Sequence, residues 1–164
     1  MNTPFTGPEH SPLEGQATLK ASLCELISQS RHQLYILAYD LDPLIYSNDD
    51  FNQQLSALAR RSKRPNIRLL LHNANRLLSH PHRVLPLLQR LSSLIEVRQL
   101  NEQYKNQWQS YIITDQPAML YQATYERYDA IVGNDPRKIA EMRKQFEQMW
   151  QHSGIATTLR RQML

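Results

Sequence analysis

Hydrophobic residues along this chain alternate between helical stripes and short continuous runs. Residues 19–27 repeat apolar side chains at intervals of three and four positions, which is the spacing of one helix face. Residues 34–39 and 67–71 instead form runs of strand length that are almost wholly apolar. Because a strand that is covered on both faces has no polar alternation, these runs predict a sheet that lies between helices.

The second half of the chain continues this alternation and adds a hairpin. Ser47, followed three positions later by Asp50, predicts the start of one helix, and Pro81 predicts the start of another. A short strand is predicted at residues 94–97. A turn sequence between two apolar runs predicts a hairpin over residues 111–121.

A long helix completes the predicted order of elements. Asp135 followed by Pro136 is a typical helix start, and apolar residues recur with helical spacing through residues 139–150. Strands separated by helices favour right-handed crossovers between parallel strands. We therefore predict the α/β fold class, with a mixed, largely parallel sheet flanked by helices on both faces.

Composition sets the expected domain limits and compartment. The segment 1–15, rich in proline and glycine, predicts a flexible N-terminal lead-in, residues 16–154 predict one α/β domain, and residues 155–164 predict a C-terminal tail. No signal peptide and no apolar stretch of membrane length is visible. Cys24 is the single cysteine and fits a packed thiol in a reducing compartment. These features predict a cytoplasmic protein with no membrane partner.

Between residues 18 and 153 the order of elements resembles one repeat of the phospholipase D-like superfamily. Segments 30–36, 66–71 and 95–98 are similar to the strands that precede the catalytic hairpin, and the last helix carries Phe146-x-x-x-Trp150-x-x-Ser153. In active members the hairpin carries His-x-Lys-x-x-x-x-Asp. Its histidine is the nucleophile, its lysine neutralises the phosphate and its aspartate supports the site. The resemblance therefore implies a phospholipase D-like fold.

The hairpin of this chain departs from that motif. Registered on Asp115, Trp108 occupies the position of the nucleophile and Ser110 that of the lysine. An indole N–H only donates hydrogen bonds, and a serine carries no positive charge for a phosphoryl group. The resemblance thus implies a domain that is not an enzyme but a binding or scaffold module, with a degenerate pocket formed by Trp108, Ser110 and Asp115. Because the superfamily pairs two repeats, it also implies a homodimer through the hairpin cleft.

Two alternatives remain open beside a scaffold that binds a protein partner. One is a phosphodiester-processing enzyme with a rebuilt active site. The other is a nucleic-acid-binding module, for which the net charge of +4 and two basic runs, at residues 60–64 and 160–161, supply phosphate contacts. Such a run is more often a solvated helix end, so nucleic acid is not the favoured partner. The candidate phosphate contacts are those of the run at residues 60–64, namely Arg60, Arg61, Lys63 and Arg64.

Histidines and aromatic residues give two further candidate sites. The histidines are His72, His80 and His82. No additional metal ligand lies at a recognisable spacing from them, so neither a metal site nor a cofactor is predicted. His152 is interpreted as a partner of a helix dipole. Aromatic residues around the hairpin form either a stacking platform for a planar ligand or half-buried structural positions, and the structural interpretation is favoured. These residues are Tyr104, Trp108, Tyr111, Tyr121, Tyr125 and Tyr128.

Overall fold

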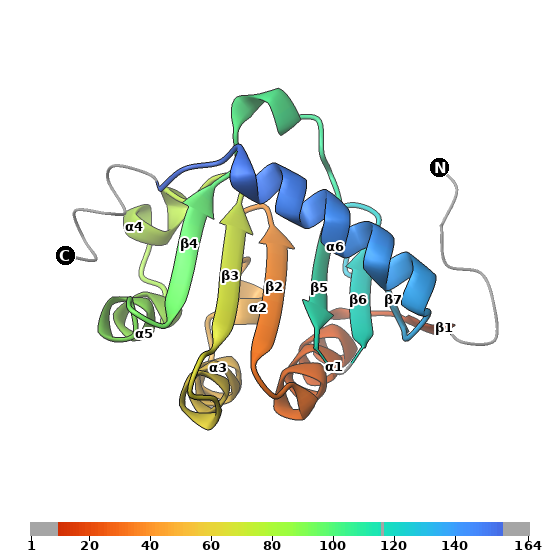
Figure 1. The fold of residues 1–164 in the computed structure, drawn as a ribbon, viewed down its shortest axis with the longest axis horizontal. Helices are drawn as coiled ribbons and strands as arrows, with labels where there is room; N and C mark the ends of the chain where they lie inside the picture. Colours follow the sequence, from red (N-terminus) through yellow and green to blue (C-terminus); the bar gives the residue numbers. More distant parts are fainter. Residues whose placement is uncertain (1–9, 116, 156–164) are drawn as a thin grey trace.

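The apolar runs of the sequence form the centre of a seven-stranded sheet in a computed structural model, which describes residues 10–115 and 117–155 (Figure 1). The strands, in the order in which they lie side by side, are β1 (His10–Leu13), β7 (Ala130–Gly133), β6 (Ala118–Gln122), β5 (Ser110–Thr114), β2 (Gln33–Ala38), β3 (Asn66–Leu71) and β4 (Ile95–Gln99).

Helices cover both faces of this sheet (Figure 1). One face carries α1 (Gln16–Gln29), α3 (Asp49–Arg61) and α5 (Val84–Arg90), and α6 (Pro136–Gln151) crosses the other. Three shorter elements follow the parallel strands at their carboxyl ends. They are α2 (Pro43–Tyr46) after β2, α4 (Arg76–Ser79) after β3 and the 3-10 turn η1 (Glu102–Tyr104) after β4.

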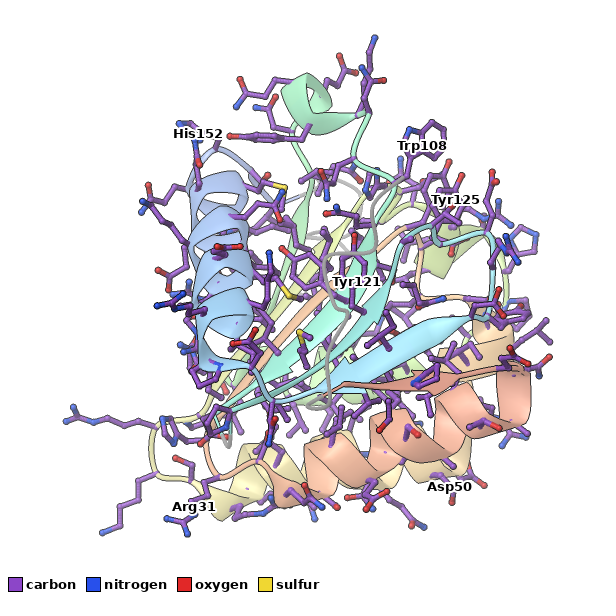
Figure 2. The ribbon with its side chains drawn as sticks, turned by 90° about the vertical axis from the view of Figure 1, so that its right-hand side faces the viewer. Arg31, Asp50, Trp108, Tyr121, Tyr125 and His152 are labelled. Carbon is purple, nitrogen blue, oxygen red and sulfur yellow. The ribbon has the colours of Figure 1, made fainter. Side chains whose placement is uncertain are left out.

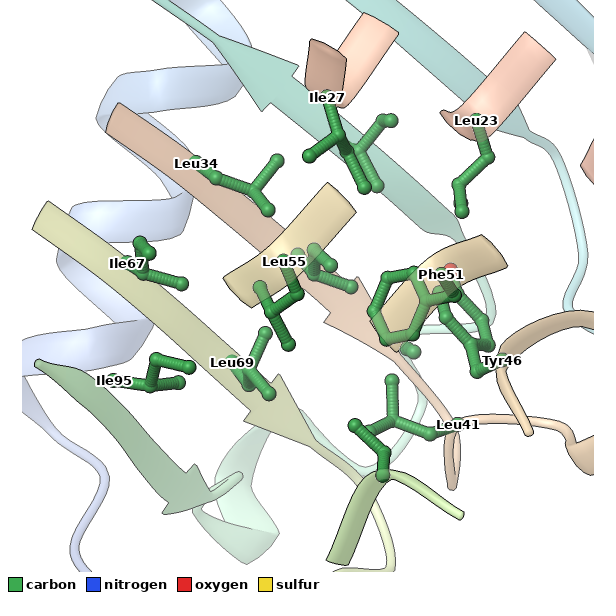
Figure 3. Packing of buried hydrophobic residues seen from close by; sticks show 14 of the residues in the cluster. Leu23, Ile27, Leu34, Leu41, Tyr46, Phe51, Leu55, Ile67, Leu69 and Ile95 are labelled. Atoms are coloured by element: carbon green, nitrogen blue, oxygen red, sulfur yellow. The ribbon is translucent and has the colours of Figure 1, made fainter. Parts of the chain in front are cut away.

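Two hydrophobic clusters hold the layers together, and neighbouring residues of β2 point into different clusters. Leu34 and Ile36 pack beneath α1 and α3, beside Leu55 and Ile67 in the cluster that Figure 3 shows. Leu37 belongs to the second cluster, beneath α6. Because successive side chains of a strand point to opposite faces, an almost continuous apolar run is what a doubly covered strand requires.

The start of the last helix is confirmed in detail. Asp135 is the N-cap, and its side chain accepts a hydrogen bond from the backbone N–H of Arg137 at 3.0 Å, with Pro136 at the first helical position. The helix predicted near Ser47 begins at Asp49, because the side chain of Asn48 accepts the hydrogen bond from the N–H of Phe51 and caps it.

The mixed α/β class is confirmed, although the sheet is less parallel than expected. Among the described strands only the β2–β3 and β3–β4 pairs are parallel. Strand β5 pairs antiparallel with β2, and β6, β7 and β1 continue the sheet with antiparallel pairs. The excess of antiparallel pairs arises because the hairpin joins β2 directly and two short strands that were not predicted, β7 and β1, extend its far side.

The expected flexible lead-in is wrong in part. Residues His10 to Leu13 form the edge strand β1, whose partners in β7 run from Gly133 to Ala130. Pro12 obscures this strand in the sequence, since proline within sheets is confined largely to edge strands. Residues 1–9 and 156–164, which contain most of the remaining lead-in and nearly all of the predicted tail, lie outside the described residues. In the part of the chain that is described, no helix is long and apolar enough to cross a membrane.

Replacing Phe146 by alanine tests how α6 is held to the sheet. The ring of Phe146 is fully buried and stacks on Tyr35 with centroids 4.6 Å apart. We expect the free energy of unfolding to fall by about 3–5 kcal/mol in urea titrations. The matched control is Lys144→Ala, an exposed position of the same helix, which should change stability by no more than about 0.5 kcal/mol. Equal stability of the two variants would contradict this packing.

Candidate functional site

Three aromatic side chains and a histidine lie at one edge of the sheet, beyond the carboxyl ends of β2 and β3. Tyr39 follows β2, His72 follows β3, Trp108 precedes β5 and Tyr125 follows β6. Because β5 runs antiparallel to β2, its first residues lie at the same edge as the last residues of β2. Open α/β sheets place their ligand sites at this edge.

Four of these rings form one stacked column. Trp108 stacks on Tyr125 with centroids 5.9 Å apart and an interplanar angle of 12°. Tyr125 stacks on Tyr39 at 4.2 Å and 13°, and Tyr39 stacks on His72 at 5.5 Å and 27°. The backbone N–H of Tyr125 also donates to the carbonyl oxygen of Trp108 at 2.9 Å, which ties the two loops together. Figure 2 shows Trp108 and Tyr125 side by side at this edge.

The column differs in membership from the aromatic group seen in the sequence. Tyr111 and Tyr121 stack on each other beneath α6, so their role is structural as expected. Tyr104 contacts His152, and Tyr128 donates a hydrogen bond to Asp42, so neither belongs to the column. Tyr39 was missed and His72 was considered only as a metal ligand, because only the fold brings these two residues to the hairpin. Their position directly after buried strands was the signal available in the sequence.

The column separates two hollows that Tyr39 and Tyr125 line from both sides. The larger has a volume of about 500 Å³ and the smaller about 320 Å³. Polar residues of the larger hollow include Asp40, Asp42, Arg76, Ser110, Gln122 and Glu126. Polar residues of the smaller hollow include His72, Gln99, Asn101, Glu102 and Lys105.

Ser110 is part of the wall of the larger hollow but is not free to react. Its side chain is buried, and its hydroxyl donates a hydrogen bond to the carbonyl oxygen of Leu37 at 3.1 Å. Trp108 lies at the rim of the smaller hollow and keeps 49% of its surface exposed. The two positions that the resemblance assigns to a cation and a nucleophile are therefore filled by a fixed hydroxyl and a stacked indole.

The structure does not bring Asp115 together with Trp108 and Ser110, so the predicted three-residue pocket is wrong. Asp115 follows the last residue of β5, at the opposite end of the strand. Its carboxylate accepts hydrogen bonds from the backbone N–H groups of Arg31 at 2.9 Å and His32 at 3.0 Å. The ring Nδ1 of His32 lies 2.8 Å from the same carboxylate. Asp115 thus anchors the loop that enters β2.

Electrostatics at Asp115 follow from these contacts. Burial by itself raises the pKa of the carboxyl, but the N–H groups of Arg31 and His32, with the ring of His32, hold it below its ordinary value. A depressed pKa in the folded state means that the ionised carboxylate stabilises the fold.

The basic run lies around the end of α3, away from the aromatic column. The guanidinium of Arg61 donates to the carbonyl oxygens of Ser28 and Ser30, so this side chain ties the end of α3 to the end of α1. Arg60 lines a groove of about 400 Å³ between α3 and α5 together with Arg83 and Arg90. Lys63 and Arg64 are exposed beyond α3.

Two of the histidines have defined environments. His82 is buried, with Nε2 2.8 Å from the carbonyl oxygen of Leu41 and Nδ1 accepting from the N–H of Val84, so it holds a loop in place. His72 lines the smaller hollow, and its Nε2 is buried with no hydrogen-bond partner among the described residues. Burial lowers the pKa of His72, which favours the neutral ring. Within the described ranges, no cluster of three or more His, Cys, Asp or Glu side chains could hold a metal ion.

Comparisons with known proteins bear on the family and on the fold. Residues 15–162 match a family model described as "Domain of unknown function (DUF7931)". The curated proteins contain no match to this sequence. Among solved structures, NucT from Helicobacter pylori superimposes with a TM-score of 0.66 at 15% identity, over 90% of this chain and 98% of that chain.

Two further structures have the same fold. Nuc from Salmonella typhimurium, described as a phospholipase D family member, gives a TM-score of 0.64 at 13% identity, over 88% of this chain and 97% of that chain. TrmBL2, described as an archaeal chromatin protein with a novel mode of DNA binding, gives 0.65 at 13% identity, over 95% of this chain. This chain spans only 57% of TrmBL2. These likenesses confirm the predicted phospholipase D-like fold.

Replacing Asp115 by alanine tests the loop anchor. We expect a loss of about 1.5–3 kcal/mol in the free energy of unfolding at neutral pH, because two backbone N–H groups lose a charged acceptor. The variant should show this whole decrease in the free energy of unfolding above about pH 4. The decrease should shrink as the pH falls through the depressed pKa of Asp115 in the folded state, because the wild-type carboxylate then becomes protonated.

The measurement is urea unfolding of wild type and variant over this range of pH. The control is Asp129→Ala, since Asp129 is exposed and pairs only with the exposed Arg127 among the described residues. This substitution should lower the free energy of unfolding by less than about 1 kcal/mol. A loss at Asp115 that is independent of pH would contradict the role of its charge.

Proposed function

Because the chain belongs to the DUF7931 family, whose description names no activity, we propose a function from the site itself: a non-catalytic phospholipase D-like domain that binds a ligand at the carboxyl edge of β2 and β3. The observation that carries this proposal is the pair Trp108 and Ser110. One is stacked on Tyr125 and the other donates to the carbonyl oxygen of Leu37.

Phosphodiester cleavage in the resembling superfamily needs a nucleophile and a fixed positive charge beside the phosphate. Neither an indole nor a buried serine hydroxyl supplies them. What this edge retains is concave and partly aromatic, as ligand sites usually are. Loss of the reactive groups with retention of two hollows supports a binding module.

A homodimer through the hairpin cleft is part of this proposal. Three large apolar side chains are conspicuously exposed among the described residues: Leu44 at 54%, Trp108 at 49% and Ile155 at 48%. Leu44 lies in α2, between two residues that line the larger hollow, and Trp108 lines the smaller one. Pairing of two copies across this edge would cover both side chains, as the paired repeats of the superfamily imply.

Compartment and other partners follow as proposals of the same kind. Cys24 is partly buried in α1, and burial raises the pKa of its thiol, which suits a packed thiol in the reducing cytoplasm. A protein partner remains compatible with the scaffold role. Nucleic acid is not favoured, because Arg61 is committed to carbonyl oxygens of α1 and Arg60 lines a groove between α3 and α5, away from the aromatic column.

One observation favours a second candidate function, a phosphodiester-processing enzyme with a rebuilt active site. His72 and Lys105 line the same hollow, which places an imidazole and a primary amine beside Trp108. The lowered pKa of His72 keeps the imidazole available as a nucleophile, and Lys105 supplies a positive charge.

Hydrolysis of bis(p-nitrophenyl) phosphate separates the two functions. We expect the wild-type protein to release p-nitrophenol no faster than buffer alone, because a stacked indole and a hydrogen-bonded hydroxyl stand where the superfamily motif has its nucleophile and its cation. The same assay is run on His72→Ala and, as a matched control, on the exposed His80→Ala. Turnover by the wild type that His72→Ala abolishes and His80→Ala retains would overturn the non-catalytic proposal.

Sedimentation equilibrium tests the dimer. The wild type is expected at twice the chain mass of 19.2 kDa, and Leu44→Lys together with Trp108→Lys should shift it to the monomer by placing charge in the covered edge. Ile155→Lys changes the third exposed apolar residue and should leave the dimer intact. A monomeric wild type, or equal dissociation by Ile155→Lys, would remove the dimer from the proposal.

A further inference from the structure

The larger hollow carries negative charge, although the chain as a whole carries a net charge of +4. Asp40, Asp42 and Glu126 line it, and Arg76 is the one cationic side chain among its described lining residues. Pro43 and Ile45 add an apolar wall. The hollow therefore combines an excess of carboxylates with a surface that suits hydrocarbon.

The backbone between the two aspartates is fixed in an unusual conformation. Leu41 has a φ of 56°, in the left-handed region that bulky residues rarely occupy. Its side chain is fully buried, and its carbonyl oxygen lies 2.8 Å from Nε2 of His82. Because both sides of this residue are held by packing, Asp40 and Asp42 stay in the wall of the same hollow.

Tyrosine hydroxyls converge with these carboxylates. The hydroxyl of Tyr128 donates to Asp42 at 2.8 Å, and burial followed by this hydrogen bond raises the pKa of Tyr128 to about 12. Burial raises the pKa of Tyr125 too, and the neighbouring Tyr39, Glu126 and Asp40 add to that shift. Both hydroxyls stay protonated at neutral pH and leave the carboxylates as the charged acceptors of the hollow.

Asp40 is partly withdrawn from water and only incompletely compensated. Its side chain is 16% exposed, and its Oδ2 lies 3.1 Å from Nε of Arg76, whose own side chain is 52% exposed. Burial raises the pKa of Asp40 even though the charge of Arg76 opposes that shift. A second cation beside Asp40 would therefore be stabilised more than one in open solvent.

The column determines how a cation is recognised. One face of Tyr39 is covered by His72 and the other by Tyr125, and Tyr125 lies between Tyr39 and Trp108. A cation–π contact needs a free ring face, so these two rings cannot provide one inside the hollow. The carboxylates of the hollow favour cations that carry N–H donors, because charge-assisted hydrogen bonds to a carboxylate are short and strong.

We propose that the larger hollow binds a small organic cation through a guanidinium or primary ammonium group, held by Asp40, Asp42 and Glu126, with its hydrocarbon part against Pro43 and Ile45. This inference rests on the proposed function, since it names the ligand class of the same edge. A phosphate group at this place would face three carboxylates and one guanidinium, so the charge of the hollow is opposite to what a phosphodiester requires.

Saturation-transfer NMR with butylguanidinium as the probe tests the proposal on the full chain. Its neutral isostere, butylurea, has nearly the same shape without the charge. We expect saturable binding of butylguanidinium and about tenfold weaker binding of butylurea. A peptide that contains one arginine and is blocked at both ends is titrated in parallel, and tighter binding of this peptide would assign the cation to a protein partner instead of a free small molecule.

Two variants that change the charge of the larger hollow in opposite directions provide the decisive test. Glu126→Gln should weaken the binding of butylguanidinium by about fivefold. Arg76→Gln should strengthen this binding by about twofold or more, because Asp40 loses the side chain that competes for it. Glu102→Gln, in the smaller hollow, is the matched control and should have no effect. If the hollow bound an anion instead, Glu126→Gln would strengthen the binding of that anion and Arg76→Gln would weaken it.

The outcomes separate this inference from the proposed function. Equal binding of the two isosteres, or no saturable binding of butylguanidinium, would overturn the cation site. Binding of inorganic phosphate that Arg76→Gln weakens would overturn the cation site and leave a non-catalytic binding module standing. Cleavage of a phosphodiester by the wild type would overturn the proposed function itself.

Discussion

The direct pairing of β5 with β2 is the constraint on which the rest of the structure depends. In its register Leu37 lies opposite Tyr111 and Leu34 lies opposite Thr114. The start of β5 is thereby fixed beside the carboxyl end of β2, where the aromatic column forms. Its other end is fixed beside the entry to β2, where Asp115 receives two backbone N–H groups. One antiparallel pair thus gives the hairpin one end that carries part of the aromatic column and one end that anchors the entry to β2.

Burial on both faces made the centre of the fold predictable. The apolar runs at residues 34–39 and 67–71 contain most of β2 and most of β3, and Asp135 with Pro136 marked α6, because these signals are local. The edge strand β1 carries Pro12 and relies on one neighbour, so its sequence showed no strand pattern. The pocket of Trp108, Ser110 and Asp115 failed for a geometric reason, since five extended residues separate the ends of β5 by roughly 15 Å. Stacking of Tyr39 on His72 joins the two loops that follow β2 and β3 and has no local signature in the sequence.

A shared fold does not carry a shared activity, and this edge shows why. The phospholipase D-like sheet supplies the position of the hollow. The side chains of the loops determine its chemistry, and here they include Asp40, Asp42 and Glu126. Leu41 holds its left-handed backbone between the two aspartates because its side chain is fully buried. Asp40 and Asp42, on either side of Leu41, both line the larger hollow.

Nitrogen-edited NMR titration of the backbone amides tests most directly whether this edge has exchanged phosphate chemistry for binding of a cation. Butylguanidinium and inorganic phosphate are added separately to the same protein. We predict that butylguanidinium shifts the amides of residues 39–46 and 125–128, while phosphate leaves them unchanged. Shifts of those amides by phosphate, with none from butylguanidinium, would contradict the assignment of the edge as a non-catalytic cation site.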